Sequence, residues 1–399
     1  MAEISIEVIL ADNTRAACGG PRLIRYSAGG VVVALASQGW DVRCIDLMSD
    51  KSLSAVLEQN PADVCCYAVF FGNKVNAFRH MEKVRRAKKT PRLIVAFGLF
   101  ASVFPEEILT RGLADVVVTG DPEFVIPAVL REINNNASWK TIPNLSYLHE
   151  GEVLHTHKDS SHDLDAIPFI SPYLCTQGHR PAVMMTARGC QYHCLFCDRN
   201  ALWGGGVRQR SVDNVLREIK ELVDIHHVQQ ISFLDEDLAA DRIRLVKLCQ
   251  GIRNLNGNFF WECSACVDSV NKETLWLMGR SGCRAIYFGV ESASPQVLRR
   301  IGKMYGRQDI LNAVRWGQEA GLRVEVMVTI GNPGETDLDR DMTLSVLKEM
   351  GQKVNVVTNR LVILPGTALY RKGLREGMYT QESYFEDEGI IHYEEKERV

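Results

Sequence analysis

The stretch Thr186-Ala187-Arg188-Gly189-Cys190-Gln191-Tyr192-His193-Cys194-Leu195-Phe196-Cys197 places three thiols close together, with the spacing Cys-x3-Cys-x2-Cys. Thiolates are the soft ligands that hold iron–sulfur clusters, and short spacings let one loop bind several irons of one cube. Three ligands are one fewer than a [4Fe-4S] cube needs, so one iron would be open to another molecule. We therefore predict Cys190, Cys194 and Cys197 as the metal ligands.

A structural zinc site is the alternative for these thiols. Such a site usually has four ligands, often arranged as two paired groups. His193 is the candidate for a fourth ligand, but it lies between Cys190 and Cys194, too close in the loop to complete a tetrahedron easily. The spacing therefore favours iron–sulfur over zinc.

The motif, with the aromatic Phe196 before its last cysteine, resembles the signature of the radical S-adenosylmethionine (SAM) superfamily. The resemblance implies that SAM chelates the open iron and is cleaved reductively to a 5′-deoxyadenosyl radical. It also implies a set of SAM-binding residues that follow the strands of the second half of the chain. By this resemblance, the ammonium is held by Asp235 or Glu236, the ribose by Glu291 and Ser292, and the adenine by Ile330 and Gly331, with Phe196 in the cluster loop.

Residues 1–135 alternate apolar strand patterns with helical patterns, which predicts a Rossmann-like parallel sheet. Segments such as residues 112–123 resemble the N-terminal cobalamin-binding domain of many radical SAM enzymes. Ligands of such sheets lie at the carboxyl ends of the strands. The tentative cobalamin-binding residues are therefore Asp12, Asn13, Gly72, Gly98 and Gly120.

The functional loops of this half match the cobalamin binders less well. Phe97-Gly98 stands where a Gly-Gly pair is typical, and the chain has no Asp-x-His-x-x-Gly sequence to supply a histidine to cobalt. A sheet that binds no cobalamin, or binds something else, stays open as the alternative.

The remaining chain divides into three parts. Residues 136–181 are predicted to be a linker that contains a hairpin turning at Glu150-Gly151. Residues 182–372 again alternate strands with helices, one of them N-capped by Ser211, and resemble the partial (β/α)6 barrel of radical SAM enzymes. Residues 373–399 form a C-terminal tail. The predicted fold is thus α/β in both halves.

A second cysteine pair, Cys263 and Cys266, lies on a predicted strand. Residues three apart on a strand point to opposite faces, so the two thiols are not expected to bind one metal. Cys266 remains a candidate hydrogen donor or nucleophile toward the substrate. No role follows from the sequence for Cys65, Cys66 or Cys175.

The composition limits the partners. The net charge is −3 over 399 residues, and no long Lys/Arg run indicates nucleic-acid binding. No apolar run reaches the length of a membrane span and no signal peptide is evident, so a cytoplasmic protein is expected, with its twelve cysteines reduced. The expected partners are a small-molecule substrate and a reducing electron donor such as flavodoxin or ferredoxin.

The sequence therefore predicts a radical SAM enzyme that methylates an unactivated centre in a small metabolite with the help of cobalamin. The first alternative is radical cyclisation, rearrangement or sulfur insertion without net methylation and without cobalamin. A non-catalytic metal-binding scaffold is the second, but a scaffold would need none of the SAM-binding positions around Asp235, Glu291 and Gly331.

Overall fold

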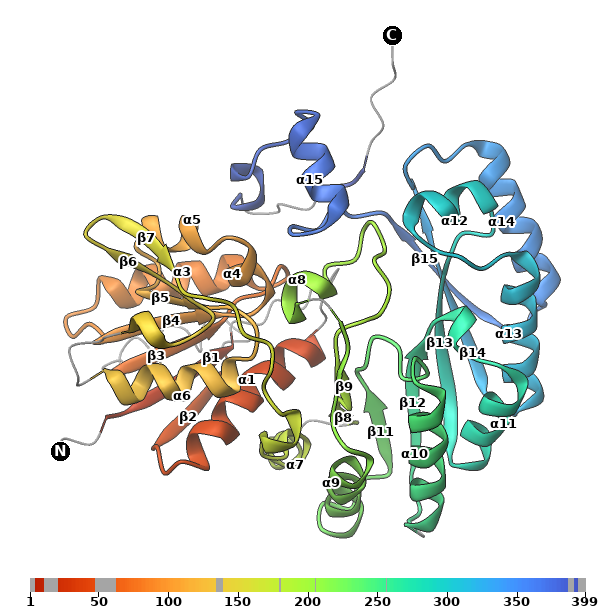
Figure 1. Cartoon of the computed structure of the whole chain (residues 1–399), viewed down its shortest axis with the longest axis horizontal. Coiled ribbons are helices and arrows are strands. Elements are labelled where there is room, and N and C mark those ends of the chain that lie inside the picture. Colours follow the sequence, from red (N-terminus) through yellow and green to blue (C-terminus); the bar gives the residue numbers. More distant parts are fainter. Residues whose placement is uncertain are drawn as a thin grey trace. The chain divides into compact units, whose positions relative to one another are not determined.

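A computed structural model describes residues 4–10, 21–46, 62–133, 139–178, 181–204, 206–255, 257–386 and 391–393. The chain divides into two compact units (Figure 1). The first contains Met1–Gly178 and Ala201–Gly204, and the second contains His179–Asn200 and Gly205–Val399. Each unit is built around its own sheet.

The first unit contains a seven-stranded sheet with the order β2-β1-β3-β4-β5-β6-β7. Neighbouring strands from β2 to β5 pair in parallel, and β5, β6 and β7 pair antiparallel. The strands are β1 (Ile6–Leu10), β2 (Val42–Asp46), β3 (Val64–Ala68), β4 (Leu93–Phe97), β5 (Val116–Val118), β6 (Leu145–His149) and β7 (Glu152–His155). Every residue of β1, β3, β4 and β5 is buried, as expected of parallel strands covered on both faces.

Helices connect these strands in the order expected of a doubly wound sheet. They are α1 (Pro21–Ala36), α3 (Lys74–Arg85), α4 (Leu99–Val103), α5 (Pro105–Thr110), α6 (Pro122–Glu132) and α7 (Ile170–Thr176). Helix α1 packs against α6 and α7. The predicted α/β fold of the N-terminal half is confirmed.

The hairpin β6–β7 turns at Glu150 and Gly151, both of which have positive φ angles. Its first strand pairs with the edge of β5, so the hairpin extends the N-terminal sheet. An otherwise unpaired strand edge gains backbone hydrogen bonds in this way. The sheet consequently continues beyond the boundary expected near residue 135, and the first unit reaches Gly178.

The second unit contains six parallel strands that neighbour one another in chain order, from β8 at one edge to β15 at the other. They are β8 (Ala182–Met184), β11 (Gln230–Phe233), β12 (Phe260–Ala265), β13 (Cys283–Glu291), β14 (Arg323–Ile330) and β15 (Asn355–Arg360). Two short strands, β9 (Ala187–Arg188) and β10 (Arg208–Gln209), form a separate antiparallel pair. This order confirms the predicted partial (β/α)6 architecture.

The helices of the second unit alternate with its strands. They are α9 (Val212–Asp224), α10 (Arg242–Asn254), α11 (Lys272–Arg280), α12 (Pro295–Ile301), α13 (Arg307–Glu319), α14 (Asp337–Met350) and α15 (Ala368–Arg375), while the short α8 (Arg199–Trp203) is shared with the first unit. Ser211 caps α9, because its side chain accepts a hydrogen bond from the Asn214 amide. This predicted cap is confirmed.

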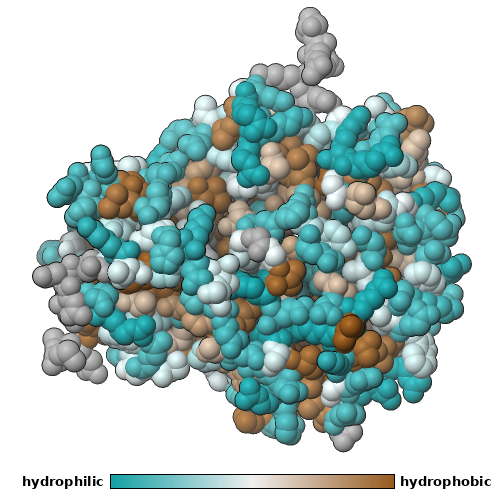
Figure 2. Space-filling model, viewed as in Figure 1, coloured by the Kyte–Doolittle hydropathy of each residue, from teal (hydrophilic) through white to brown (hydrophobic). Residues whose placement is uncertain are grey.

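The surface is dominated by hydrophilic residues on the face that Figure 2 shows, with smaller hydrophobic groups between them. Among the described residues, none of the helices combines the length and the apolar character that crossing a membrane requires.

Candidate active site

The three predicted metal ligands lie in one loop of the second unit, after β9. Gly189 opens the loop with φ +91°, and a Cβ atom there would lie 2.1 Å from the carbonyl oxygen of Gly206. Only glycine fits such a close backbone approach. Leu195 then fixes the middle of the loop, because its amide donates to the Ile301 carbonyl at 3.0 Å and its carbonyl accepts from the Leu369 amide at 3.0 Å.

The thiols of this loop are chemically suited to an iron–sulfur cluster. Cys190, Cys194 and Cys197 are free and half-buried, and burial raises the pKa of each. Metal coordination favours the thiolate form and would oppose this shift. Within the described ranges, no three His, Cys, Asp or Glu side chains converge as ligands of one metal ion. A cube binds each thiolate through a different iron, so the three thiols need not meet at one point.

Asp235 follows β11 and is only 3 % exposed. Its Oδ1 accepts hydrogen bonds from the Thr186 amide at 3.0 Å, the Thr186 hydroxyl at 3.0 Å and the Ala187 amide at 2.5 Å. Arg244 donates to the same Thr186 hydroxyl at 3.1 Å and to the Thr186 carbonyl at 3.1 Å. Burial raises the pKa of Asp235, while the Thr186 hydrogen bonds and the Arg244 charge oppose that shift. Asp235 therefore ties the segment before the cluster loop to the end of β11.

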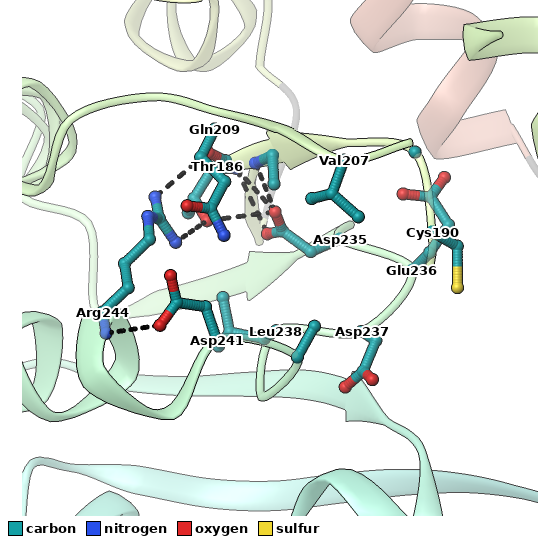
Figure 3. Close-up of a pocket in the computed structure, with 13 residues that line it drawn as sticks. Thr186, Cys190, Val207, Gln209, Asp235, Glu236, Asp237, Leu238, Asp241 and Arg244 are labelled. Atoms are coloured by element: carbon teal, nitrogen blue, oxygen red, sulfur yellow. Dashed lines mark hydrogen bonds between the residues drawn. The ribbon is translucent and has the colours of Figure 1, made fainter. Parts of the chain in front are cut away.

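Glu236 and Asp237 continue from Asp235 into a pocket that also contains Cys190 (Figure 3). The Glu236 carboxylate lies 3.7 Å from the Arg199 guanidinium. Figure 3 shows Cys190, Glu236 and Asp237 toward one end of the pocket and Arg244 toward the other. The lining residues are Thr186, Ala187, Gly189, Cys190, Val207, Gln209, Asp235, Glu236, Asp237, Leu238, Ala240, Asp241 and Arg244.

Asp237 presents one unpartnered oxygen. Its Oδ1 accepts from the Ser269 hydroxyl at 2.9 Å and from the amides of Ala239 and Cys266 at 3.2 and 3.3 Å. In the described part of the chain, its buried Oδ2 has no hydrogen-bond partner. Burial raises the pKa of Asp237 to about 6. This side chain is thus able to accept a further hydrogen bond or a cation.

Glu291 ends β13 at a β-bulge and has φ +62°, which is unusual for a residue other than glycine. The hydroxyl of Tyr305 donates to the carbonyls of Gly289 and Val290 at 2.8 and 3.1 Å, so it braces this bulge. Oε2 of Glu291 accepts from the Thr329 hydroxyl at 2.6 Å. Burial raises the pKa of Glu291, and the Lys303 charge opposes the shift.

The other predicted SAM-binding residues are distributed around this strand edge. The Ser292 hydroxyl is fully buried and already bonded to Thr343 and to the Ser294 amide, each at 3.1 Å. Gly331 donates its amide to Glu335 at 2.7 Å, and Ile330 is 43 % exposed. Phe196 is half-buried in the cluster loop. Glu291 and Ser292 lie next to each other at the end of β13. The Ser292 hydroxyl stabilises the turn there through its hydrogen bonds to Thr343 and Ser294.

Lys303 is a site residue that the sequence did not reveal. Its side chain follows Gly302, the left-handed cap of α12, and is only 6 % exposed. The charges of Cys266, Cys194, Glu291 and Asp268 raise the pKa of Lys303, although its burial opposes them. Its amide donates to the Leu298 carbonyl at 2.8 Å, but among the described residues its ammonium group has no hydrogen bond and no ion pair within 4 Å. A lysine that follows a helix cap is usually exposed to solvent, so nothing in the sequence singles out Lys303. Its burial in the folded structure is what draws attention to it.

The glycines predicted to contact cobalamin lie at the strand ends of the first unit. Gly98 has φ +98°, and a Cβ atom there would lie 2.7 Å from the Phe70 ring and 2.8 Å from the Val69 carbonyl. Packing against Val69 and Phe70 therefore explains why this position has no side chain. A Cβ at Gly72 would meet nothing within 4 Å, and Gly120 has φ +81°. Asp12 and Asn13 lie outside the described residues.

Comparison with known families identifies the domain that contains these residues. Residues 184–347, which contain the cluster loop, Asp235, Glu291 and Lys303, match the family model of the radical SAM superfamily. The chain carries a radical SAM domain. Such a domain implies a [4Fe-4S] cluster and SAM, in agreement with the prediction from the cysteine motif.

Curated relatives of this radical SAM protein include two that are named as methyltransferases. An uncharacterised methyltransferase of Pyrococcus horikoshii is 29 % identical over 243 residues, which cover 59 % of this chain and 53 % of the relative. Cytidylyl-2-hydroxyethylphosphonate methyltransferase of Streptomyces wedmorensis is 24 % identical over 327 residues, or 72 % of this chain and 61 % of the relative. The chain thus spans between half and two thirds of the length of these two relatives.

The fold of the radical SAM protein is shared over nearly its whole length with a solved structure. The cobalamin-dependent SAM radical enzyme OxsB, solved with aqua-cobalamin and SAM, matches 98 % of this chain and 64 % of its own with a TM-score of 0.81 and 18 % identity. The methyltransferase TsrM of Kitasatospora setae matches 93 % of this chain and 76 % of its own, with a TM-score of 0.78 and 17 % identity. Both comparisons cover the N-terminal sheet as well as the radical SAM domain.

Proposed function

We propose that this protein is a cobalamin-dependent radical SAM methyltransferase that acts on a small molecule. The observation that carries the proposal is the pairing of a radical SAM domain with a Rossmann-like unit, matched across 98 % of the chain by OxsB. The methyltransferase names of two curated relatives and of TsrM support methyl transfer as the outcome.

The radical SAM domain offers a separate group for each part of SAM. Cys190, Cys194 and Cys197 would hold the cluster, which supplies the electron that cleaves SAM. Glu236 lies in the pocket beside Cys190, whereas Asp235 already accepts several hydrogen bonds from the main chain. We therefore assign Glu236 to the ammonium, although both residues were candidates.

Lys303 would receive the carboxylate of SAM. A buried ammonium without a hydrogen-bonded partner costs several kcal/mol, and an anion beside it would offset that penalty. Glu291 would accept hydrogen bonds from the ribose hydroxyls, with Thr329 and Tyr305 fixing its position. Proximity and orientation are what these residues contribute to the reaction.

The first unit would bind cobalamin, which supplies the methyl group when it is bound. Gly72 and Gly120 are the described glycines that leave room at the strand ends, because a Cβ atom at either would have no neighbour closer than 3.6 Å. Gly98 is needed by its own sheet and is a weaker candidate. A low-potential donor such as flavodoxin or ferredoxin would reduce the cluster.

Anaerobic purification with cobalamin supplied, followed by quantitation of iron, sulfide and cobalt, tests this proposal. We expect about four irons, the content of one cube, and near-stoichiometric cobalt. Turnover with SAM and reductant should then give both 5′-deoxyadenosine and S-adenosylhomocysteine. The second product is the mark of methyl transfer, since it is SAM without its methyl group.

Radical chemistry without net methylation is the second candidate, because OxsB is described as a radical enzyme and not as a methyltransferase. It predicts 5′-deoxyadenosine without S-adenosylhomocysteine. A protein that holds iron and forms 5′-deoxyadenosine, but binds no cobalt, would exclude the cobalamin assignment and leave this candidate standing.

A further inference from the structure

Cys266 lies at the end of β12 on the face that carries the polar residues of that strand. Glu262 marks this face, because its carboxylate accepts from the Tyr287 hydroxyl of β13 at 2.9 Å and from the Gln230 amide of β11 at 3.3 Å. Side chains alternate along a strand, so Ser264 and Cys266 share the face of Glu262. The extended backbone of Cys266, with φ −77° and ψ 150°, continues this alternation past the end of the strand.

Cys263 belongs to the opposite face. It is fully buried, and its thiol hydrogen-bonds with Cys283 and lies within the electrostatic reach of Cys249 of α10. The two thiols of this Cys-x2-Cys pair thus have separate surroundings, as the spacing predicts. Cys263 is part of the core beneath the sheet and is a matched comparison for Cys266.

The main chain of Cys266 is held next to Asp237, which shares a pocket with Cys190 of the cluster loop. Its amide donates to Asp237 at 3.3 Å and its carbonyl accepts from the Ser269 hydroxyl at 2.8 Å, which fixes the main chain at this point. The thiol is 8 % exposed, and the charges that act on it include those of Cys190, Lys303, Asp237 and Asp268. A fourth thiol therefore lies next to a residue, Asp237, that lines the pocket containing Cys190.

Lys303 gives an independent indication that an anion belongs here. It is more than nine-tenths buried, and the charges around its ammonium group include those of Cys266 and Cys194. The ring centroids of Tyr305 and Tyr192 lie 5.7 and 5.9 Å from Nζ, at the outer limit of a cation–π contact. Before SAM supplies its carboxylate, this ammonium has no hydrogen-bonded counter-ion among the described residues.

We propose that Cys266 is the fourth ligand of the cluster when SAM is absent. The proposal rests on the proposed function of the cluster loop. On cluster assembly, the Cys266 thiol would lose its proton to solvent and form an Sγ–Fe bond to the iron that the motif leaves open. On SAM binding, that bond would break, the amino and carboxylate groups of SAM would take the iron, and the thiolate would take up the proton that the SAM ammonium group loses. No electron is gained or lost in this exchange.

The charges around the site account for the exchange. A Cys266 thiolate beside Lys303 would neutralise the buried ammonium in the resting protein, and the SAM carboxylate would do so in the loaded protein. Lys303 would thus face one anionic group in each state. The open iron would also be shielded from solvent and from loss by oxidation until SAM arrives.

Oxidative loss of iron from the SAM-free protein tests this role without relying on turnover. Wild type, Cys266→Ala, Cys266→Ser and the control Cys263→Ala are reconstituted anaerobically and treated with limiting ferricyanide. Electron paramagnetic resonance then measures conversion to the three-iron cluster, and iron analysis measures the loss. We expect the Cys266 variants to convert at least ten times faster than wild type and Cys263→Ala. Added SAM should slow the variants to the wild-type rate.

The outcomes separate the two proposals. If wild type and both Cys266 variants, all holding a complete cluster, lose iron at the same rate, Cys266 is not a ligand, and the proposed function is unaffected. If reconstituted wild type holds no [4Fe-4S] cluster, the proposed function itself fails. If the core control Cys263→Ala loses iron as fast as the Cys266 variants, the defect reflects packing and the ligand role is also excluded.

Discussion

Replacement of Asp235 by alanine should destabilise the second unit and loosen the cluster loop. The substitution removes the acceptor of the buried Thr186 amide and of the partly buried Ala187 amide. Each buried donor left unsatisfied costs about 1–3 kcal/mol, so the expected loss is about 4 kcal/mol. For a unit of this size, Tm should fall by roughly 2–4 °C per kcal/mol, or about 8–16 °C in total.

Calorimetry of the apoprotein measures the loss, and iron content after reconstitution reports on the loop. Asp337→Asn is the control, because its side chain is 93 % exposed in the same unit and should leave Tm unchanged. Asp235→Asn keeps one acceptor oxygen and should fall between wild type and Asp235→Ala. A Tm for Asp235→Ala within about 2 °C of wild type, less than the shift of a single lost bond, would refute the reasoning.

Three further predictions concern other parts of the chain. Gly98→Ala should destabilise the first unit by more than about 1 kcal/mol, because its φ is +98° and the new Cβ would meet Phe70 and Val69. Gly72→Ala is the control, since a Cβ there has open space and should not destabilise the unit. Urea unfolding measures the free energy of unfolding of both variants. Burial, helped by the Lys83 charge, lowers the pKa of His80 to about 4, below its ordinary 6.5. Its stability contribution is therefore present above pH 6.5 and lost as the pH falls toward 4, by up to about 3 kcal/mol, and His80→Gln should remove this pH dependence from urea midpoints. Tyr305→Phe should release the bulge at Glu291 and raise the KM for SAM about tenfold with little change in kcat, whereas a merely structural role would lower Tm and leave KM unchanged.

The sequence by itself determined the features that depend only on residues close together in the chain. The spacing of Cys190, Cys194 and Cys197 lies within one loop, and the cap at Ser211 depends on a partner three residues away. Strands β1, β3, β4 and β5 of the first sheet could also be predicted, because parallel strands covered on both faces are apolar throughout. Periodicity also predicted that Cys263 and Cys266 face opposite sides of their strand.

Only the tertiary structure decided the roles that depend on distant contacts. Asp235 pairs with amides 48 and 49 positions earlier, and the buried Lys303 has its Nζ 5.9 Å from the ring centroid of Tyr192 in the cluster loop. The hairpin at Glu150 joins the N-terminal sheet because β5 offers it an edge. Hydrogen bonds, burial and charge at these positions depend on contacts between strand ends that are far apart in the sequence. They could therefore not be predicted from any single segment.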